Sequence, residues 1–263
     1  MVSDAAAADA GGEPAREILG GSQAERAERL DPERRHADSL GSTVASTSQI
    51  DAPPSTAQHR AMSMPPGGAD VSKPRLWLVR HGETEWAKDG RHTGRTDIPL
   101  TGLGRSQAVA VGLKIGHHLF VQVLSSPLSR ALETCRIAGF GAHVEVVDDL
   151  REWDYGTDEG RTTEEIREER PGWSIWGEGP QGGETVDALG ARADRVIARA
   201  MSVSGDTLCF AHGHILRVIA ARWLELPPVE GQRFALSTAT LSVLGWERET
   251  AVVIRWNEAC VGV

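Results

Sequence analysis

A short apolar run, residues 76–79, ends in Arg80, His81 and Gly82, and this junction constrains the fold more than any other feature of the chain. Four consecutive apolar residues predict a buried strand, and the abrupt basic ending places two ionisable side chains at its carboxyl edge. Open α/β sheets bind ligands at that edge. We therefore expect a central strand that carries Arg80 and His81 into a ligand site.

Three further polar residues follow short apolar runs in the same way. They are Arg130 after the run 121–124, Glu152 after the run 144–147, and His212 after the run 207–211. Each residue taken alone has an ordinary structural interpretation, as a surface group, a solvated carboxylate or a helix cap. Their common position after strand-like segments instead favours one shared site at the sheet edge.

Helical and strand-like segments alternate through the second part of the chain. The predicted helices span about 101–118, 128–137, 162–170, 184–201 and 215–224, and two terminal strands span 241–246 and 252–256. Alternation of this kind predicts the α/β class. We expect a three-layer sandwich with a mostly parallel central sheet and helices on both faces.

The first 74 residues contain no Phe, Trp or Tyr and are rich in small, polar and charged residues. Such a segment buries too little apolar area to offset its chain entropy. We therefore predict a disordered extension over residues 1–73, with a transient helix near residues 15–30. The folded domain is predicted to span residues 74–263.

Charge and cysteine content narrow the class of protein. A net charge of −9 argues against binding nucleic acid or a membrane surface through bulk electrostatics. No apolar run approaches the length of a membrane span, and the start of the chain does not resemble a signal peptide. The three cysteines are widely spaced and form no Cys-x-x-Cys pattern, which is typical of reduced thiols. We expect a cytoplasmic protein.

The four strand-end segments carry the groups that phosphoryl transfer through a histidine requires. A neutral imidazole at His81 can attack a phosphate ester without charge repulsion and hold the phosphoryl group covalently. Arg80 and Arg130 can bind its equatorial oxygens, with His212 as a further donor. Glu152 is the candidate proton donor to the leaving oxygen. The predicted activity is a phosphatase that needs no metal or other cofactor.

Four details of this site are expectations. Gly82 is expected to let the backbone come close to the phosphate. Gly213 leaves room for a main-chain N–H at a helix start, which is a common anion site. His212 is expected to be an imidazolium, and an anionic neighbour should raise the pKa of Glu152.

Two other phosphatase chemistries fit the sequence less well. No cluster of carboxylates and histidines has the spacing of a metal site. A cysteine phosphatase is excluded because no arginine follows any of the three cysteines at the distance that a phosphate loop requires.

With these residues in place, the chain resembles the histidine phosphatase superfamily, which includes cofactor-dependent phosphoglycerate mutases. The resemblance covers about residues 75–258, and its central motif is residues 78–86. Within the family, three more segments look like bacterial acid phosphatases and fungal sedoheptulose bisphosphatases. They are residues 151–156, 175–185 and 210–217.

The resemblance implies a phosphohistidine at His81, phosphate contacts from Arg80, Arg130 and His212, and proton transfer by Glu152. It also implies a substrate pocket that includes Thr93, Gly94, Tyr155 and Gly213. The substrate is expected to be a small phosphate ester, with a sugar phosphate or bisphosphate as the implied class. Arg91, Arg95, Trp153, Trp173 and Trp176 are further candidates for shaping the leaving-group pocket.

Departures from the family pattern leave alternatives open. Ala87 stands where the family often has an asparagine that touches phosphate, and Thr163 stands where mutases place a lysine. Missing cations favour water as the acceptor, whereas Tyr155 fits the mutase pattern. A bisphosphoglycerate-dependent mutase and a catalytically silent phospho-ligand binding protein therefore remain alternatives. A homodimer, paired through the terminal strand, is equally open.

Overall fold

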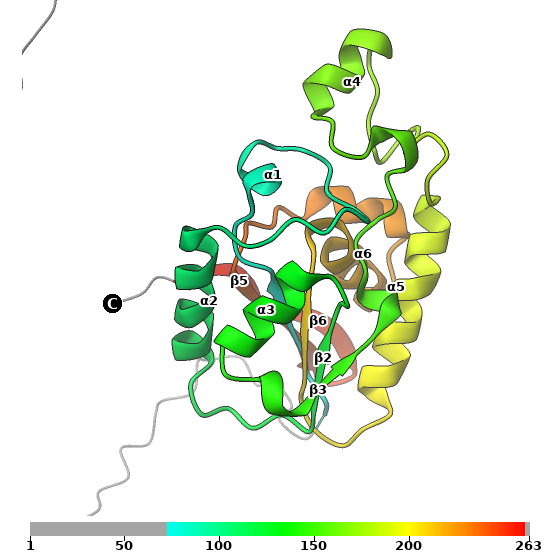
Figure 1. The fold of residues 1–263 in the computed structure, drawn as a ribbon. Coiled ribbons are helices and arrows are strands. Elements are labelled where there is room, and N and C mark those ends of the chain that lie inside the picture. Colours follow the sequence, from blue (N-terminus) through cyan, green and yellow to red (C-terminus); the bar gives the residue numbers. More distant parts are fainter. Residues whose placement is uncertain (1–72, 261–263) are drawn as a thin grey trace, which may run out of the picture. The chain divides into compact units, whose positions relative to one another are not determined.

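The computed structural model describes residues 73–260, in which six strands form one sheet between two layers of helices (Figure 1). The strands are β1 (Leu76–Arg80), β2 (Gln122–Ser125), β3 (Val144–Val146), β4 (Thr207–Ala211), β5 (Thr240–Glu247) and β6 (Thr250–Ala259). Their order is β3-β2-β4-β1-β5-β6. The first four are parallel, whereas β5 runs antiparallel to both β1 and β6. The predicted extension and its helix near 15–30 lie outside the described residues.

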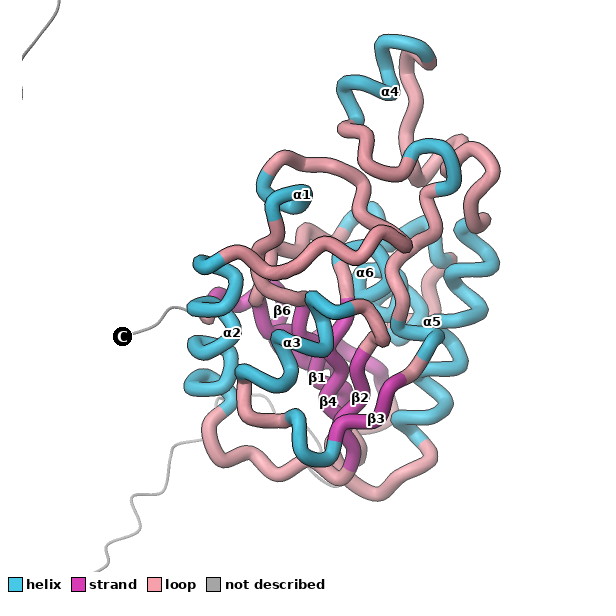
Figure 2. Tube along the Cα trace, viewed as in Figure 1, coloured by secondary structure: helices cyan, strands magenta, loops and turns pink. Residues whose placement is uncertain are grey.

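Helices cover both faces of this sheet (Figure 2). The helices of the described residues are α1 (Glu85–Lys88), α2 (Gly102–Ile115), α3 (Ser129–Ile137), α4 (Thr163–Glu169), α5 (Val186–Met201) and α6 (Gly213–Trp223), of which α1 and α4 lie beyond the edge of the sheet. Helices α2 and α3 pack on one face, and α5 and α6 pack on the other. The predicted α/β class, with a mostly parallel sheet between two helical layers, is confirmed.

The central strand β1 explains why the sequence shows an unbroken apolar run. Leu76 and Leu78 point into the core shared with α5 and α6, while Trp77 and Val79 point into the core shared with α2 and α3. A strand covered on both faces has no solvent side, so polar residues do not alternate along it. Pairing with β4, in which Leu76 lies opposite Thr207 and Arg80 opposite Ala211, sets the position of the residues that follow β1.

Local signals place the helix ends. The Thr162 side chain accepts a hydrogen bond from Glu165 N, and the Glu165 carboxylate accepts one from Thr162 N, which is the predicted capping box of α4. Helix α2 ends at Ile115 rather than near residue 118, because Gly116 adopts a φ of +63°. The short helix α1, capped by Thr84, escaped the sequence analysis because a single turn has no periodicity.

The opposite, amino-terminal edge of the parallel strands is held by one carboxylate. Asp206 accepts hydrogen bonds from Arg75 Nη2 at 2.7 Å and Trp77 Nε1 at 3.1 Å. The His118 ring contributes a third contact at 2.7 Å. Burial alone would raise the pKa of Asp206, but the hydrogen bonds from Arg75 and His118 lower it.

Within residues 73–260 no helix has the length and apolarity that crossing a membrane requires.

Candidate active site

The carboxyl edge of the sheet brings the five predicted catalytic residues together. Arg80 ends β1 and His81 follows it, while His212 follows β4 directly. Arg130 lies in the first turn of α3, and Glu152 follows the segment after β3. Arg80, His81 and Glu152 line one cavity of about 170 Å³. The rings of His81 and His212 lie 5.1 Å apart between centroids.

His81 has the environment of a neutral nucleophile. Its Nδ1 lies 2.7 Å from Gly82 O, which can only accept a hydrogen bond. We therefore assign the proton to Nδ1, so that Nε2 keeps its lone pair. His81 is 4% exposed. Burial, together with the charges of Arg130 and Arg80, holds the pKa of His81 well below its ordinary value.

Gly82 serves a different purpose from the one expected. A Cβ at Gly82 would lie 2.3 Å from Gly104 O, and a Cβ at Gly104 would lie 2.2 Å from Glu83 O. The space beside Gly82 is therefore filled by the start of α2, and the expected approach of this backbone to a phosphate is wrong. The two glycines let α2 press against the loop that carries His81. Gly82 N also donates to Thr134 Oγ1 at 3.0 Å, which fixes the loop from α3.

Arg80 offers donors to an anion in the cavity. Its Nη1 donates to Leu236 O at 2.6 Å, but its buried Nε has no hydrogen-bond partner among residues 73–260. A buried donor without a partner costs about 1–3 kcal/mol, which an incoming oxyanion would recover. A Cβ at Gly213 would lie 3.5 Å from Arg80 Cζ and 3.6 Å from Glu152 Oε2. The absence of a side chain at Gly213 thus keeps this part of the cavity open.

Arg130 and His212 form a hydrogen-bonded pair beneath His81. Arg130 Nε donates to His212 Nδ1 at 3.2 Å, and the remaining guanidinium nitrogens donate to the carbonyl oxygens of Thr93, Gly94 and Thr96 at 3.0 Å. His212 Nε2 lies 2.8 Å from Ser126 Oγ. Because Nδ1 accepts a hydrogen bond, His212 is neutral here. Burial and the charge of Arg130 hold its pKa well below the ordinary value, so the expected imidazolium is not present in this structure.

Glu152 caps the start of helix α6. Its carboxylate accepts hydrogen bonds from Trp153 N at 2.9 Å and from His214 N and Ile215 N at 3.0 Å each. Two of these amides belong to the first turn of α6, so the anion expected at this helix start is Glu152 itself.

Burial alone would raise the pKa of Glu152, but hydrogen bonding at His214 holds it well below the ordinary value. The expected rise in this pKa is therefore absent from the structure. A carboxylate bound by backbone amides is stabilised as the anion, and the sequence showed no sign that this residue caps a helix.

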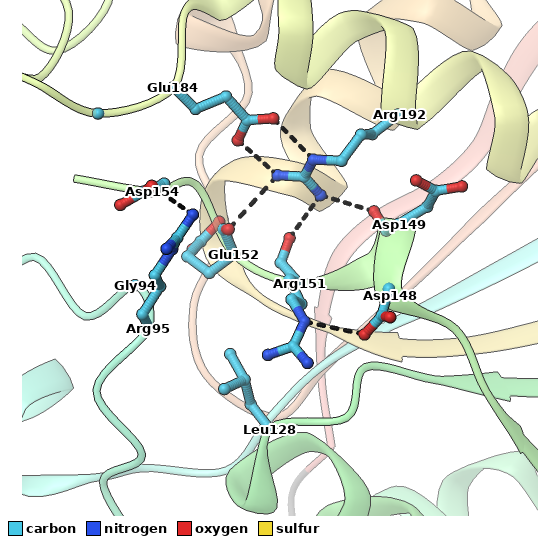
Figure 3. A pocket seen from close by; sticks show the side chains of 11 residues that line it. Gly94, Arg95, Leu128, Asp148, Asp149, Arg151, Glu152, Asp154, Glu184 and Arg192 are labelled. Carbon is cyan, nitrogen blue, oxygen red and sulfur yellow. Dashed lines mark hydrogen bonds and ion pairs between the residues drawn. The ribbon is translucent and has the colours of Figure 1, made fainter. Parts of the chain in front are cut away.

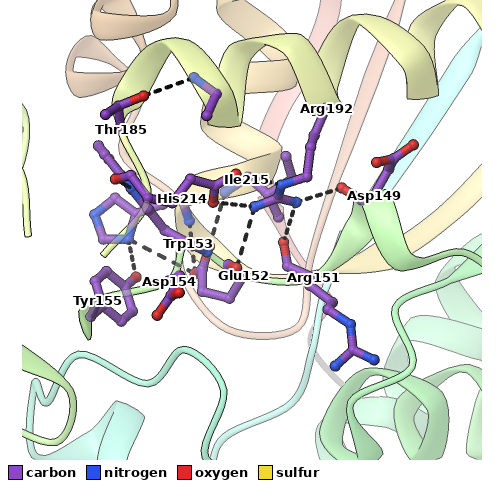
Figure 4. A network of polar contacts seen from close by, with 12 residues as sticks. Asp149, Arg151, Glu152, Trp153, Asp154, Tyr155, Thr185, Arg192, His214 and Ile215 are labelled. Atoms are coloured by element: carbon purple, nitrogen blue, oxygen red, sulfur yellow. Dashed lines mark hydrogen bonds and ion pairs between the residues drawn. The ribbon is translucent and has the colours of Figure 1, made fainter. Parts of the chain in front are cut away.

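Tyr155 and His214 form a second pair against Glu152. Tyr155 Oη lies 2.7 Å from His214 Nδ1, whereas Glu152 Oε2 lies 3.8 Å from the same nitrogen. Burial and the charge of Glu152 raise the pKa of Tyr155 well above its ordinary value, so the phenol stays protonated. Its O–H donates a hydrogen bond to His214 Nδ1. Figure 4 shows this pair beside the Glu152 carboxylate. His214 was part of a motif in the sequence but was given no role there.

The two predicted pocket residues Thr93 and Gly94 lie on either side of the site. Thr93 lines the 170 Å³ cavity, and Gly94 lines a neighbouring cavity of about 530 Å³. Gly94 N donates to both oxygens of Glu159, at 2.9 and 3.0 Å. The main-chain amide of Gly94 is thus bound by a carboxylate of the protein.

The larger cavity lies on the far side of Glu152 and differs in charge (Figure 3). It is lined by five carboxylates and three arginines, and His81 does not contribute to it. The smaller cavity contains Arg80, Arg91 and Arg217 against the single carboxylate of Glu152. A phosphate dianion is therefore favoured in the smaller cavity.

Arg91, a candidate for the leaving-group pocket in the sequence analysis, lines the smaller cavity, and Arg217 adds a cation that the sequence analysis did not place there. Arg217 lies one helical turn after His214 on α6, and its Nε donates to Gly231 O at 3.1 Å. The three-residue spacing of His214 and Arg217 along a helix that begins at the carboxyl edge of the sheet is the signal that could have identified both. Ala87 also lines the cavity, in the place where the family often has an asparagine.

Neither a metal site nor a reactive thiol is present among the described residues. Residues 73–260 contain no cluster of three or more His, Cys, Asp or Glu side chains arranged to hold a metal ion. Cys135, Cys209 and Cys260 are free thiols, and burial raises the pKa of Cys135 to about 12. A thiol with such a pKa is a poor nucleophile at neutral pH.

Comparison with known proteins identifies the family. The model of the histidine phosphatase superfamily (branch 1) matches residues 76–259. An acid phosphatase of Mycobacterium tuberculosis is 43% identical over 190 residues, which cover 70% of this chain and 93% of that protein. A sedoheptulose 1,7-bisphosphatase of Saccharomyces cerevisiae is 39% identical over 186 residues, which cover 58% of this chain and 68% of that protein.

Solved structures agree with the sequence comparison. The product of a functionally characterised open reading frame of Mycobacterium tuberculosis superposes with a TM-score of 0.68 and 41% identity. The superposition covers 72% of this chain and 99% of that one. The predicted family and the predicted enzyme class, a phosphatase, are thereby confirmed. The chain belongs to the histidine phosphatase superfamily, branch 1.

Proposed function

We propose that this protein hydrolyses small phosphate monoesters without a metal ion, through a phosphohistidine intermediate on His81. The observation that carries this proposal is the state of His81, whose Nδ1 faces Gly82 O at 2.7 Å and whose Nε2 is left as a free nucleophile. Arg80 lines the same cavity as His81, and its buried Nε has no hydrogen-bond partner among residues 73–260. The nucleophile and an anion-binding side chain therefore line one small space.

In the first step, His81 Nε2 forms a bond to phosphorus while the bond from phosphorus to the leaving oxygen breaks. Arg80 balances the charge on the equatorial oxygens as the transferred group flattens. Glu152, in its protonated form, gives a proton to the leaving oxygen and becomes a carboxylate. The products of this step are the free alcohol and phosphorylated His81.

In the second step, water attacks the phosphorus and the bond to His81 Nε2 breaks. Glu152 takes a proton from the attacking water and returns to its acid form. Inorganic phosphate leaves, and His81 is again a neutral imidazole. No metal, oxidant or external base enters either step.

Glu152 is an anion in the free protein but must be protonated before the first step. Three backbone amides favour the carboxylate, whereas a dianionic ester in the same cavity would repel it. Substrate binding therefore raises the pKa of Glu152 and draws a proton onto it at the position where it is needed. Arg130 and His212 support the reaction by holding the loop around Thr93 and the base of the His81 pocket.

We assign sugar phosphates or bisphosphates as the substrate class. Arg91 and Arg217 line the cavity in addition to Arg80, so a second anionic group on the substrate would meet positive charge. One relative carries the name sedoheptulose 1,7-bisphosphatase, whose substrate has two phosphates. A polar pocket with Tyr155 and, besides His81, the two histidines His92 and His214 suits a hydroxyl-rich leaving group.

Phosphate release from a panel of sugar phosphates, with and without a chelator, tests the proposal. The wild-type protein should release phosphate at the same rate in both conditions, and His81→Asn should release none. Activity that is lost with the chelator, or retained at full rate in His81→Asn, would refute a metal-independent phosphohistidine mechanism.

A phosphoglycerate-type mutase is the second candidate, and Arg91 and Arg217 favour it. The sequence has Thr163 where mutases place a lysine that holds a second acidic group, but these two arginines supply positive charge to the cavity. The two functions separate in one assay with a bisphosphoglycerate present. Interconversion of phosphoglycerates faster than phosphate release supports the mutase, and the reverse order supports the phosphatase. A protein that does neither but binds phosphate esters would be a silent binding protein.

A further inference from the structure

One arginine outside the phosphate cavity contacts the main chain of the Glu152 segment at several points. Arg192, on α5, donates from Nη1 to Asp149 O at 2.7 Å and to Arg151 O at 2.9 Å. Its Nη2 lies 3.4 Å from Glu152 O. The Arg192 side chain is 15% exposed. Figure 3 shows its guanidinium reaching across the segment that carries Glu152.

Glu184 completes this arrangement from the loop before α5. Its carboxylate accepts from Arg192 Nε at 2.8 Å and from Nη2 at 2.7 Å. Its main chain binds the residues on the other side of Glu152, because Trp153 Nε1 donates to Glu184 O at 2.7 Å and Glu184 N donates to Asp154 O at 3.0 Å. The two residues therefore hold the chain both before and after Glu152 (Figure 3).

We propose that Arg192 and Glu184 act as a positioning pair that holds Glu152 in place for proton transfer to the leaving group. The inference rests on the proposed role of Glu152 as the proton donor. It assigns to neither residue any contact with the phosphoryl group, because both line the cavity on the far side of Glu152 and not the cavity of His81.

The geometry of Arg192 argues for positioning rather than for simple surface pairing. All five N–H donors of its guanidinium are directed at the Glu184 carboxylate or at the three carbonyl oxygens. A planar fork bound in this way has one orientation, so the carbonyls that it holds are fixed as well. By contrast, the next arginine on this face of α5, Arg195, hydrogen-bonds to the side chain of Asp149 and to no main-chain oxygen of residues 73–260.

Arg192→Lys and Glu184→Gln test the pair, and Arg195→Gln is the matched control. Lysine keeps the charge but cannot bind the carboxylate and three carbonyls as a planar fork. Glutamine at 184 keeps the shape and the main-chain contacts but removes the ion pair. Arg195→Gln breaks an ion pair between the same helix and the same segment without touching the main chain.

The assay compares two leaving groups, since only a poor leaving group needs a proton. kcat/KM is measured for an alkyl phosphate such as glycerol phosphate and for para-nitrophenyl phosphate. Misplacement of a catalytic group by about 1 Å can cost about 100-fold in rate. We expect Arg192→Lys and Glu184→Gln to lose about 10-fold or more with the alkyl ester but less than about 3-fold with the aryl ester. Arg195→Gln should retain both activities.

Thermal unfolding shows whether each variant folds, and the variant Glu152→Gln shows whether Glu152 acts as the proton donor at all. If Arg192→Lys does not fold, the nearly isosteric Glu184→Gln carries the test. Equal losses with both esters in folded variants, or a higher KM alone, would overturn the positioning role. If Glu152→Gln itself shows no difference between the two esters, the proposed role of Glu152 fails, and the positioning inference fails with it. If Glu152→Gln loses more activity with the alkyl ester than with the aryl ester, but neither Arg192→Lys nor Glu184→Gln does, only the positioning inference fails.

Discussion

Replacement of Glu152 by glutamine tests whether this residue is an anion that caps helix α6 as well as a proton donor. In the structure its two oxygens accept three backbone N–H groups, from Trp153, His214 and Ile215. A glutamine amide has one oxygen, so it can keep the two bonds made to Oε1. Its NH₂ group would then face the N–H of His214, and that third bond is lost.

The size of the loss follows from these contacts. A hydrogen bond to a charged acceptor contributes about 1.5–3 kcal/mol to stability, and a carboxylate at a helix N-terminus contributes up to about 1 kcal/mol more. We expect Glu152→Gln to lower the free energy of unfolding by about 3 kcal/mol. For a domain of this size the melting temperature should fall by about 6–12 °C.

The pH dependence of that loss provides the sharper measurement. Because the folded-state pKa of Glu152 is lowered, its contribution is fully present above the unfolded value of about 4.3 and is lost as pH falls through the folded value. Melting curves at pH 7 and in acid should therefore show a difference between wild type and Glu152→Gln that shrinks in acid. Glu133→Gln, which breaks the surface ion pair with Arg105, should cost less than about 1 kcal/mol. Equal stability of wild type and Glu152→Gln at pH 7 would refute the capping role.

Three other predictions follow from the same structure. Asp206→Asn should lose about 2 kcal/mol of stability at neutral pH. Because the pKa of Asp206 is lowered in the folded state, this loss should start to shrink below about 3.9 and disappear as pH falls through the folded value; urea unfolding at several pH values measures it. Gly104→Ala should lose at least about 2 kcal/mol, because its Cβ would lie 2.2 Å from Glu83 O, whereas Gly102→Ala, with open space around it, should gain up to about 1 kcal/mol. The acid limb of the pH profile of kcat/KM, which reports protonation of His81, should lie below the ordinary imidazole value of about 6.5; a limb at or above that value would contradict a neutral His81.

The positions of the candidate catalytic residues could be predicted because each follows a strand-like run of apolar residues in the sequence. Runs of apolar residues identified β1, β2, β3 and β4, and parallel strands bring their carboxyl ends to one edge. Arg80, His81 and His212 lie within one residue of such an end, so small errors in the strand bounds could not displace them.

The protonation states could not be predicted in the same way, because they depend on contacts between distant segments. The Glu152 carboxylate is bound by amides 62 and 63 residues later in the chain. The Arg130 side chain reaches His212 across 82 residues. Neither contact has a local pattern, and both reversed the expected charge state of a catalytic group.

The close packing of Gly82 against Gly104 likewise could not be predicted from the sequence. Gly82 next to His81 suggested an approach of the backbone to a phosphate, which is one of two reasons for a glycine beside a catalytic residue. The structure shows the other reason, since Gly104 of α2 occupies the space. Only the packing of α2 against the loop after β1 could distinguish these two interpretations.

The most direct test of the central claim is to identify the atom that carries the phosphoryl group during turnover. The wild-type protein is mixed rapidly with an ester that bears a labelled phosphoryl group, quenched in alkali, which preserves phosphohistidine, and digested for mass spectrometry. The account predicts label on Nε2 of His81 and none in His81→Asn. Label on another side chain, or turnover by wild type without any labelled protein at all quench times, would contradict it.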